Sequence, residues 1–183
     1  GAEVNARSAT GNSALMLAAR KHGNAALVKR LLGSGAEVDA KNVFGATALM
    51  GAVAAGDVDC VRLLLDNGAD VNAVPAMTPE GFIFGGGRTP LMWAAFRGDE
   101  PMLKLLLACG AKVAGSTPQG TALSHAAWGG HAGTARLLLD AGAPVDQRDL
   151  IANYTPLHWA ASSERLDAGL VQLLIQHRAD VNA

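Results

Sequence analysis

The chain has 183 residues, half of them hydrophobic but only 4% aromatic, so its apolar content is mostly Ala, Leu and Val and favours close-packed helical layers. Its 15 basic and 16 acidic side chains give a formal net charge of −1, which excludes the basic surface that nucleic-acid phosphates require. No stretch approaches the roughly 18 apolar residues that a membrane-spanning helix needs.

A six-residue phrase, Gly-Ala-Glu-Val-Asn-Ala, opens the chain and returns along it. Full or partial copies stand at 35–40, 68–73, 110–114, 142–146 and 179–183. The spacing from Gly35 to Gly68 is 33 residues, and from Gly110 to Gly142 it is 32. We infer an internal repeat with a period near 33 residues.

Each repeat begins its first predicted helix at a Ser or Thr, whose hydroxyl is a good helix N-cap. These starts lie at 13–15, 47–49, 89–91, 121–123 and 155–157. Pro156 suits the first helical position, where a missing N–H has no cost. Leu157, Ala160 and Ala161 then share one helical face. This small-sided face predicts close packing against another helix.

The second predicted helix of each repeat carries a stripe of Leu and Val and ends at a Gly suited to a left-handed position. These glycines are Gly35, Gly68, Gly110 and Gly142. Arg178 takes the same place in the fifth repeat. Because a residue with a Cβ resists that conformation, we expect a strained or frayed helix end at Arg178.

The period, the T-P-L-H-x-A motif at 155–160, the second helix and the closing phrase follow the order found in ankyrin repeats. The chain resembles that family over essentially its whole length. The resemblance implies an all-α solenoid of stacked helix–turn–helix units with short β-hairpin fingers. We expect one domain, 1–183, in which residues 1–6 are the tail of a preceding repeat. The repeats are expected at 7–40, 41–73, 74–114, 115–147 and 148–183.

Neither end of the predicted array carries the polar cap that a stacked array normally has. The second helix of the last repeat is as apolar as an internal one, with Leu170, Val171 and Leu173 to Ile175. We therefore expect a fragment of a longer array or of a larger protein. Self-association through the uncapped ends is a further possibility, and the sequence assigns no cellular compartment.

The third repeat contains a loop insertion at 75–87. Thr89 lies 18 positions after Val71, whereas Thr47 lies nine positions after Val38. The insertion carries a short apolar run of Phe82, Ile83 and Phe84. Two interpretations stay open for this run. It folds back and buries its rings on the array, or it is a contact element for a partner, since loops often carry function.

Each of the eight aromatic residues lies in a finger or a first helix, and these line the concave face in ankyrin proteins. Phe96 and Trp128 occupy equivalent positions of their repeats, which we call one slot, and for this slot we favour partner binding. Trp93 and Trp159 share another, for which packing between repeats is favoured. Arg88 and Arg97 are candidates for pairing with an acidic group. The expected contact patch is Phe44, Arg88, Trp93, Phe96, Arg97, His125, Trp128 and Tyr154.

No pattern of residues indicates catalysis, a metal site or a cofactor. Cys60 and Cys109 lack the spacing of a zinc site. His131 and His158 match family positions that bond backbone between repeats. We therefore expect a non-catalytic module that binds another protein or a peptide on its concave face. The alternative is a small-ligand-binding or substrate-recruiting accessory domain of a larger enzyme.

Overall fold

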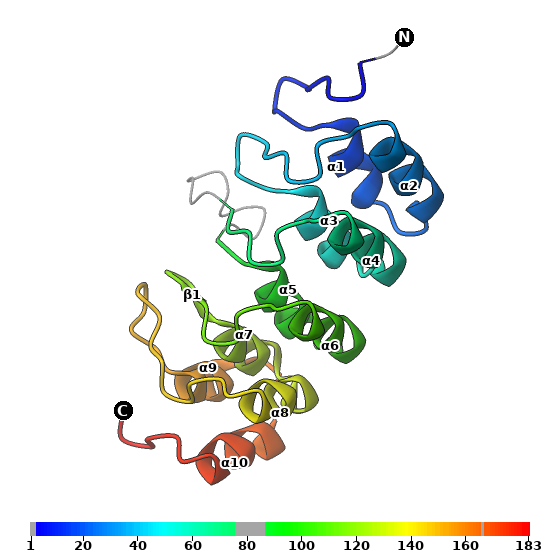
Figure 1. Cartoon of the computed structure of the whole chain (residues 1–183). Helices are drawn as coiled ribbons and strands as arrows, with labels where there is room; N and C mark the ends of the chain where they lie inside the picture. The colour runs from blue at the N-terminus through cyan, green and yellow to red at the C-terminus, as the bar shows by residue number, and fades with distance from the viewer. Residues whose placement is uncertain (1–2, 76–86, 166) are drawn as a thin grey trace. The chain divides into compact units, whose positions relative to one another are not determined.

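The computed structural model describes residues 3–75, 87–165 and 167–183. These residues form a succession of helix pairs joined by extended loops (Figure 1). The pairs are α1 (Ala14–Ala19) with α2 (Ala25–Gly33), α3 (Ala48–Ala55) with α4 (Val58–Asp66), α5 (Pro90–Arg97) with α6 (Glu100–Ala108), α7 (Ala122–Gly129) with α8 (Ala132–Asp140), and α9 (Pro156–Ser162) with α10 (Ala168–Gln176). The order of first and second helices is the one expected from the sequence.

The first helices begin at the Ser and Thr residues that the sequence predicts. Ser13 accepts a hydrogen bond from the Met16 N–H at 3.3 Å, and Thr47 caps α3 in the same way. At Thr121 and Thr155 the bond is reciprocated by the third helical residue, which makes two capping boxes. Local side-chain chemistry therefore fixes where each of these helices starts.

A residue in the left-handed region lies two positions after the last residue of each second helix. Four of these are glycines with φ between +85° and +88°, namely Gly35, Gly68, Gly110 and Gly142. Arg178 takes the same conformation with φ +67°, although it carries a Cβ. The expected strain at the end of α10 is therefore confirmed as backbone strain.

Small side chains on the first helices and branched ones on the second form the core. Ala52, Ala94, Ala95, Ala126 and Ala127 are each 0% exposed. The second helices contribute fully buried residues, among them Val28, Leu64, Leu106, Leu138 and Leu174. Alanine faces let neighbouring backbones approach closely, which is how a chain with few aromatic residues still packs densely.

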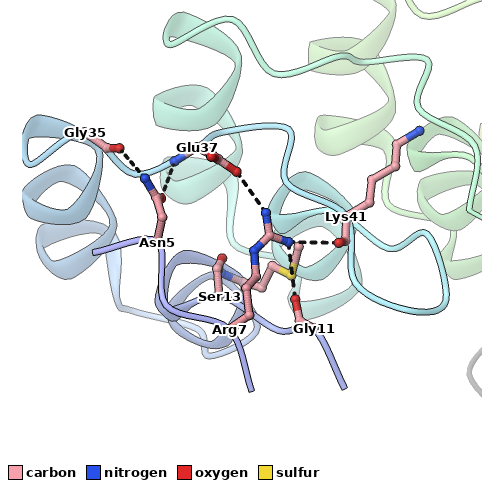
Figure 2. Close-up of polar contacts among 8 residues, drawn as sticks. Asn5, Arg7, Gly11, Ser13, Gly35, Glu37 and Lys41 are labelled. Atoms are coloured by element: carbon pink, nitrogen blue, oxygen red, sulfur yellow. Dashed lines mark hydrogen bonds and ion pairs between the residues drawn. The ribbon is translucent and has the colours of Figure 1, made fainter. Parts of the chain in front are cut away.

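In three of its copies, the repeated phrase ties one finger to the next by side chain to backbone hydrogen bonds. Asn5 donates to the Gly35 carbonyl at 3.1 Å and accepts the Glu37 N–H at 3.0 Å (Figure 2). The equivalent Asp39 and Asp146 accept backbone N–H groups one repeat later. The phrase therefore recurs because one polar side chain in it connects successive units.

Arg7 adds a second link between the first two fingers. Its guanidinium donates to the Lys41 carbonyl at 2.9 Å and to the Glu37 carboxylate at 2.8 Å (Figure 2). Because Glu37 is 59% exposed, we assign the ion pair itself little stabilisation. The link to the backbone carbonyl of Lys41 is what fixes the finger.

The fingers are mostly turns rather than ladders. Among the described residues, the named strands are β1 (Ser116–Thr117) and β2 (Gly120–Thr121), which pair antiparallel in one finger. In the finger before α3, the side chain of Asn42 accepts the N–H groups of Phe44 and Ala46, each at 3.0 Å. Side-chain acceptors of this kind replace a strand ladder with a fixed turn.

The chain divides into two units, Gly1–Pro90 and Leu91–Ala183, and each has its own core. The described helices include none that is long and apolar enough to cross a membrane. Cys60 is buried and Cys109 is exposed. The predicted contacts Phe82, Ile83 and Phe84 lie outside the described residues.

Candidate functional site

Five aromatic rings of the second unit form a continuous series, which we call the aromatic row: Trp93, Phe96, Trp128, Trp159 and Tyr154. Trp93 and Phe96 lie on α5 with ring centroids 6.4 Å apart. Trp128 on α7 is 5.1 Å from Phe96 and 5.4 Å from Trp159 on α9. Tyr154, in the finger before α9, is 5.3 Å from Trp159. Three neighbouring first helices and one finger thus contribute to one surface.

The rings of the aromatic row are only partly covered. Trp128 is 42% exposed and Tyr154 is 38% exposed. Trp93, Phe96 and Trp159 are half-buried. Tilted and edge-to-face contacts between rings are favourable in themselves. The rings therefore stabilise one another while they keep aromatic surface in contact with water.

Small residues beneath the row bring its helices together. Gly129 packs against the Phe96 carbonyl so tightly that a Cβ there would lie 2.6 Å from the oxygen. A Cβ at Gly129 would also come too close to the imidazole of His131, which lies beside the Phe96 carbonyl. Burial lowers the pKa of His131, and the Phe96 backbone opposes this shift. This close approach of α5 and α7 explains why Phe96 and Trp128 meet.

The Asp149 carboxylate positions the far end of the row. Its Oδ2 accepts the Trp159 Nε1–H at 2.9 Å and the Tyr154 N–H at 3.2 Å. Its Oδ1 accepts the N–H groups of Ile151 and Ala152 at 2.9 and 2.6 Å. Burial alone would raise the pKa of Asp149, but these four donors together lower it. One buried charge therefore fixes both an indole and the path of the finger.

Tyr154 has a second aromatic neighbour. Its ring stacks on the His158 imidazole with centroids 5.2 Å apart and planes 16° apart. The Nδ1 atom of His158 lies 2.8 Å from the Thr155 hydroxyl. This atom completes the capping box of its own helix, and the expected bond between His158 and the backbone of another repeat stays a prediction.

Two of the predicted contact residues offer little surface. His125 is 3% exposed, and its Nδ1 lies 2.9 Å from the Thr121 carbonyl oxygen. Its ring centroid is 6.5 Å from that of Trp128, so it supports the row from within. Arg88, in the first unit, is 8% exposed, and burial lowers its pKa. Direct contact through either side chain is therefore not supported.

The remaining predicted residues are more accessible. Arg97 is exposed at the end of α5 and lies one helical turn after Trp93. Phe44 is half-buried in the finger before α3, in the first unit. The structure thus gathers Trp93, Phe96, Arg97, Trp128 and Tyr154 within one unit.

Three features of this surface were not predicted from the sequence. Trp159, expected to be a packing residue, is also part of the row. Asp149 holds Trp159 in place, and Leu150 and Ile151 beside it are 82% and 58% exposed. The sequence signal for the last feature was an apolar pair within an otherwise polar finger. Among the described residues, no group of three His, Cys, Asp or Glu side chains is placed to hold a metal ion.

Comparisons with known proteins agree with the fold. Models described as "Ankyrin repeats (3 copies)" and "Ankyrin repeats (many copies)" match residues 1–75 with 91–183, and residues 51–107. The mouse Ankyrin repeat and SOCS box protein 16 is 35% identical over 82% of this chain and 40% of its own length. The Caenorhabditis elegans Ankyrin repeat and KH domain-containing protein mask-1 is 37% identical over 75% of this chain but 5% of its own. The chain therefore spans less than half of either relative.

A solved structure extends the likeness to three dimensions. The crystal structure of the human ASB11 ankyrin repeat domain matches with a TM-score of 0.84 and 30% identity. The match covers 100% of this chain and 76% of that one. The succession of helix pairs seen here is thus the same architecture.

Proposed function

Because this chain belongs to the ankyrin repeat family, whose repeats are generally protein–protein interaction modules, we propose that it binds a partner protein through the aromatic row of its second unit. The observation that carries the proposal is the partial exposure of five mutually packed rings, led by Trp128 at 42%. The rings lie on first helices and one finger, the elements that we expect from the sequence to line the binding face.

The physical case for binding rests on area and rigidity. An aromatic side chain can bury roughly 150–250 Å² and dominates the energetics of many interfaces. Phe96 holds Trp128 from one side and Trp159 holds it from the other. Rings that are already ordered lose little side-chain entropy when a partner covers them. The binding free energy gained when a partner covers Trp128 is therefore offset only slightly by the loss of side-chain entropy.

We revise the proposed contact set accordingly. It keeps Trp93, Phe96, Arg97, Trp128 and Tyr154 and adds Trp159. His125 becomes a supporting residue under Trp128, and Arg88 leaves the set because of its burial. Phe44 and the run from Phe82 to Phe84 stay candidates for separate contacts.

The alternative is an accessory domain that recruits a substrate for a larger enzyme. The names of two relatives join ankyrin repeats to a SOCS box or a KH domain, so in those proteins the repeats stand beside other domains. Such a role also requires a protein-binding surface, so the aromatic row serves both proposals. Catalysis in that case belongs to other parts of the larger protein.

The test compares partner capture by matched variants. Trp128→Ala and Tyr154→Ala remove exposed rings, whereas Ile175→Ala removes an apolar side chain of α10 that is 47% exposed. The tagged chain is used to capture proteins from a cell lysate, which are quantified by mass spectrometry. We expect the two ring variants to lose at least tenfold of the captured partner and the control to retain it.

Thermal melting separates binding from folding in this test. Because both rings are more than one third exposed, each ring variant should melt within a few degrees of the Ile175→Ala control. Undiminished capture by Trp128→Ala would refute the proposal. A large loss of stability would instead make the ring a core residue.

A further inference from the structure

The backbone carbonyl of Trp128 is held by a side chain from the next repeat. The hydroxyl of Ser163, the residue directly after α9, donates a hydrogen bond to this carbonyl at 2.8 Å. Resting on the proposed function above, we propose that Ser163 is a positioning residue of the aromatic row. It fixes the end of α7 and thereby the orientation of the Trp128 indole. Because Ser163 is only 7% exposed, it acts on partner binding through Trp128 and not by contact with the partner.

The end of α7 explains why this carbonyl requires a donor from elsewhere. The last four carbonyl groups of an α-helix have no partner within the helix. In α7 the first two of these accept N–H groups of the following turn, at 3.0 and 3.1 Å. The third, that of Trp128, accepts the hydroxyl of Ser163. The helix end that carries the most exposed ring of the row is therefore completed from another repeat.

Ser163 is itself held in place. Its hydroxyl oxygen accepts the N–H of Arg165 at 3.1 Å, so the hydroxyl both donates and accepts. The backbone of Arg165 also packs against Gly130, the C-cap of α7, where a Cβ would lie only 2.6 Å from the Arg165 carbonyl oxygen. The turn after α9 thus contacts the end of α7 at two neighbouring points. A hydroxyl fixed in this way keeps the Trp128 carbonyl in one place.

The same helix, α9, also contacts the indole of Trp128. Trp159 lies four residues before Ser163, and its ring centroid is 5.4 Å from that of Trp128. The repeat of α9 therefore holds Trp128 both by its ring and by its carbonyl. On the other side of Trp128, the Phe96 ring of α5 lies 5.1 Å away. Loss of the Ser163 bond should let the end of α7 move relative to α9 and change how the Trp128 ring meets both neighbours.

The serine before Ser163 provides a matched control. Ser162 is exposed, and its hydroxyl donates to the Trp159 carbonyl at 3.3 Å, three residues earlier in the same helix. The hydroxyl of Ser163 instead bonds a residue of the neighbouring repeat. If a hydroxyl at this point served only the end of its own helix, removing either one would have the same effect. The proposed role predicts that only the removal of the Ser163 hydroxyl changes the environment of Trp128.

The experiment observes Trp128 directly, in the whole chain labelled with fluorotryptophan. The chain has three Trp residues, so its fluorine NMR spectrum has three signals, which the single Trp→Phe variants assign. Ser163→Ala removes the hydroxyl, and Ser163→Thr keeps it on an extended backbone that a β-branched residue adopts readily. Circular dichroism shows whether each variant is folded. Should Ser163→Ala unfold the chain, Ser163→Cys takes its place, because a thiol is only a weak donor.

We expect Ser163→Ala to move the Trp128 signal by more than its line width and to leave the signal of Trp93, on α5, in place as the internal reference. Ser163→Thr and Ser162→Ala should both keep the Trp128 signal at its position in the parent. The partner protein that the parent captures and Trp128→Ala loses is then purified and titrated against each variant by calorimetry. Its dissociation constant should rise at least fivefold for Ser163→Ala and stay at the parent value for the other two variants.

An unmoved Trp128 signal in Ser163→Ala would overturn the inference, as would a shift that Ser163→Thr or Ser162→Ala reproduces. Equal binding of the purified partner by Ser163→Ala and by the parent would also overturn it. These results leave the proposed function standing as long as capture still depends on Trp128. If capture does not depend on Trp128, the proposed function fails, and the fluorine signals alone decide whether Ser163 positions the ring.

Discussion

The sharpest structural prediction concerns Asp149, the buried carboxylate at the end of the aromatic row. Replacing it by Ala removes the acceptor for four N–H donors in one step. Replacing it by Asn keeps the shape of the side chain but turns one oxygen into a donor. That donor then faces either Trp159 and Tyr154 or the N–H groups of Ile151 and Ala152. Neither orientation of the amide satisfies all four.

The magnitude follows from which donors water can reach. A hydrogen bond to a charged group contributes about 1.5–3 kcal/mol, so four at full value would sum to roughly 6–12 kcal/mol. Ile151, Ala152 and Tyr154 are exposed, and their N–H groups regain water when the carboxylate is removed. The Trp159 indole is half-buried and does so less well. We therefore expect Asp149→Ala to lower the free energy of unfolding by about 2–3 kcal/mol.

Urea denaturation of the whole chain measures this change, and near-ultraviolet circular dichroism reports on the packing of the indoles. Asp149→Asn should lose at least half as much stability as Asp149→Ala and should alter the indole signal. Asp140→Asn, an exposed change at the end of α8, is the matched control. The reasoning would be refuted if Asp149→Asn stayed within about 0.5 kcal/mol of the parent, the usual range for surface changes.

Three other predictions concern packing, backbone strain and pH. Gly129→Ala places a Cβ 2.6 Å from the Phe96 carbonyl oxygen and should cost about 1–3 kcal/mol in thermal or chemical unfolding; an unchanged melting temperature would contradict the close packing. Arg178→Gly relieves a φ of +67° and should stabilise the chain by about 1 kcal/mol, whereas Arg178→Ala, which keeps the Cβ, should not. The pKa values of Asp57 and Asp149 are lowered by hydrogen bonds that outweigh burial; their stabilisation is complete above the unfolded pKa of about 3.9 and is lost as pH falls through the lower folded values. Urea midpoints measured between pH 7 and pH 2 should therefore fall in acid, and less so for Asp57→Asn.

Much of the fold could be predicted because it depends on local chemistry. The N-caps at Thr121 and Thr155 follow from a hydroxyl beside the first helical turn. The left-handed glycines follow from the absence of a Cβ, and the strain at Arg178 from its presence. These features need only neighbours within about five residues, so the sequence pattern determines them.

The arrangement of the site was harder to predict because it depends on contacts across longer intervals. His125 shares its slot with Trp93 and Trp159, yet its smaller ring turns inward to the Thr121 carbonyl. The bond from Trp159 to Asp149 joins two residues that are ten positions apart in the sequence. The position of a residue in the repeat therefore predicts neither whether its side chain is exposed nor which other residue of the chain it bonds to.

Trp128 has a particular place in the row because it joins two different slots. Phe96 and Trp128 share the slot near the end of the first helix, but Ser162 occupies that slot in α9. The next ring, Trp159, comes from the slot one turn earlier, and Trp128 contacts both Phe96 and Trp159 at 5.1 and 5.4 Å. The row consequently turns from the helix ends toward the finger that carries Tyr154. A partner that covered the row from α5 to α9 would also have to cover Trp128, because this ring contacts both Phe96 and Trp159.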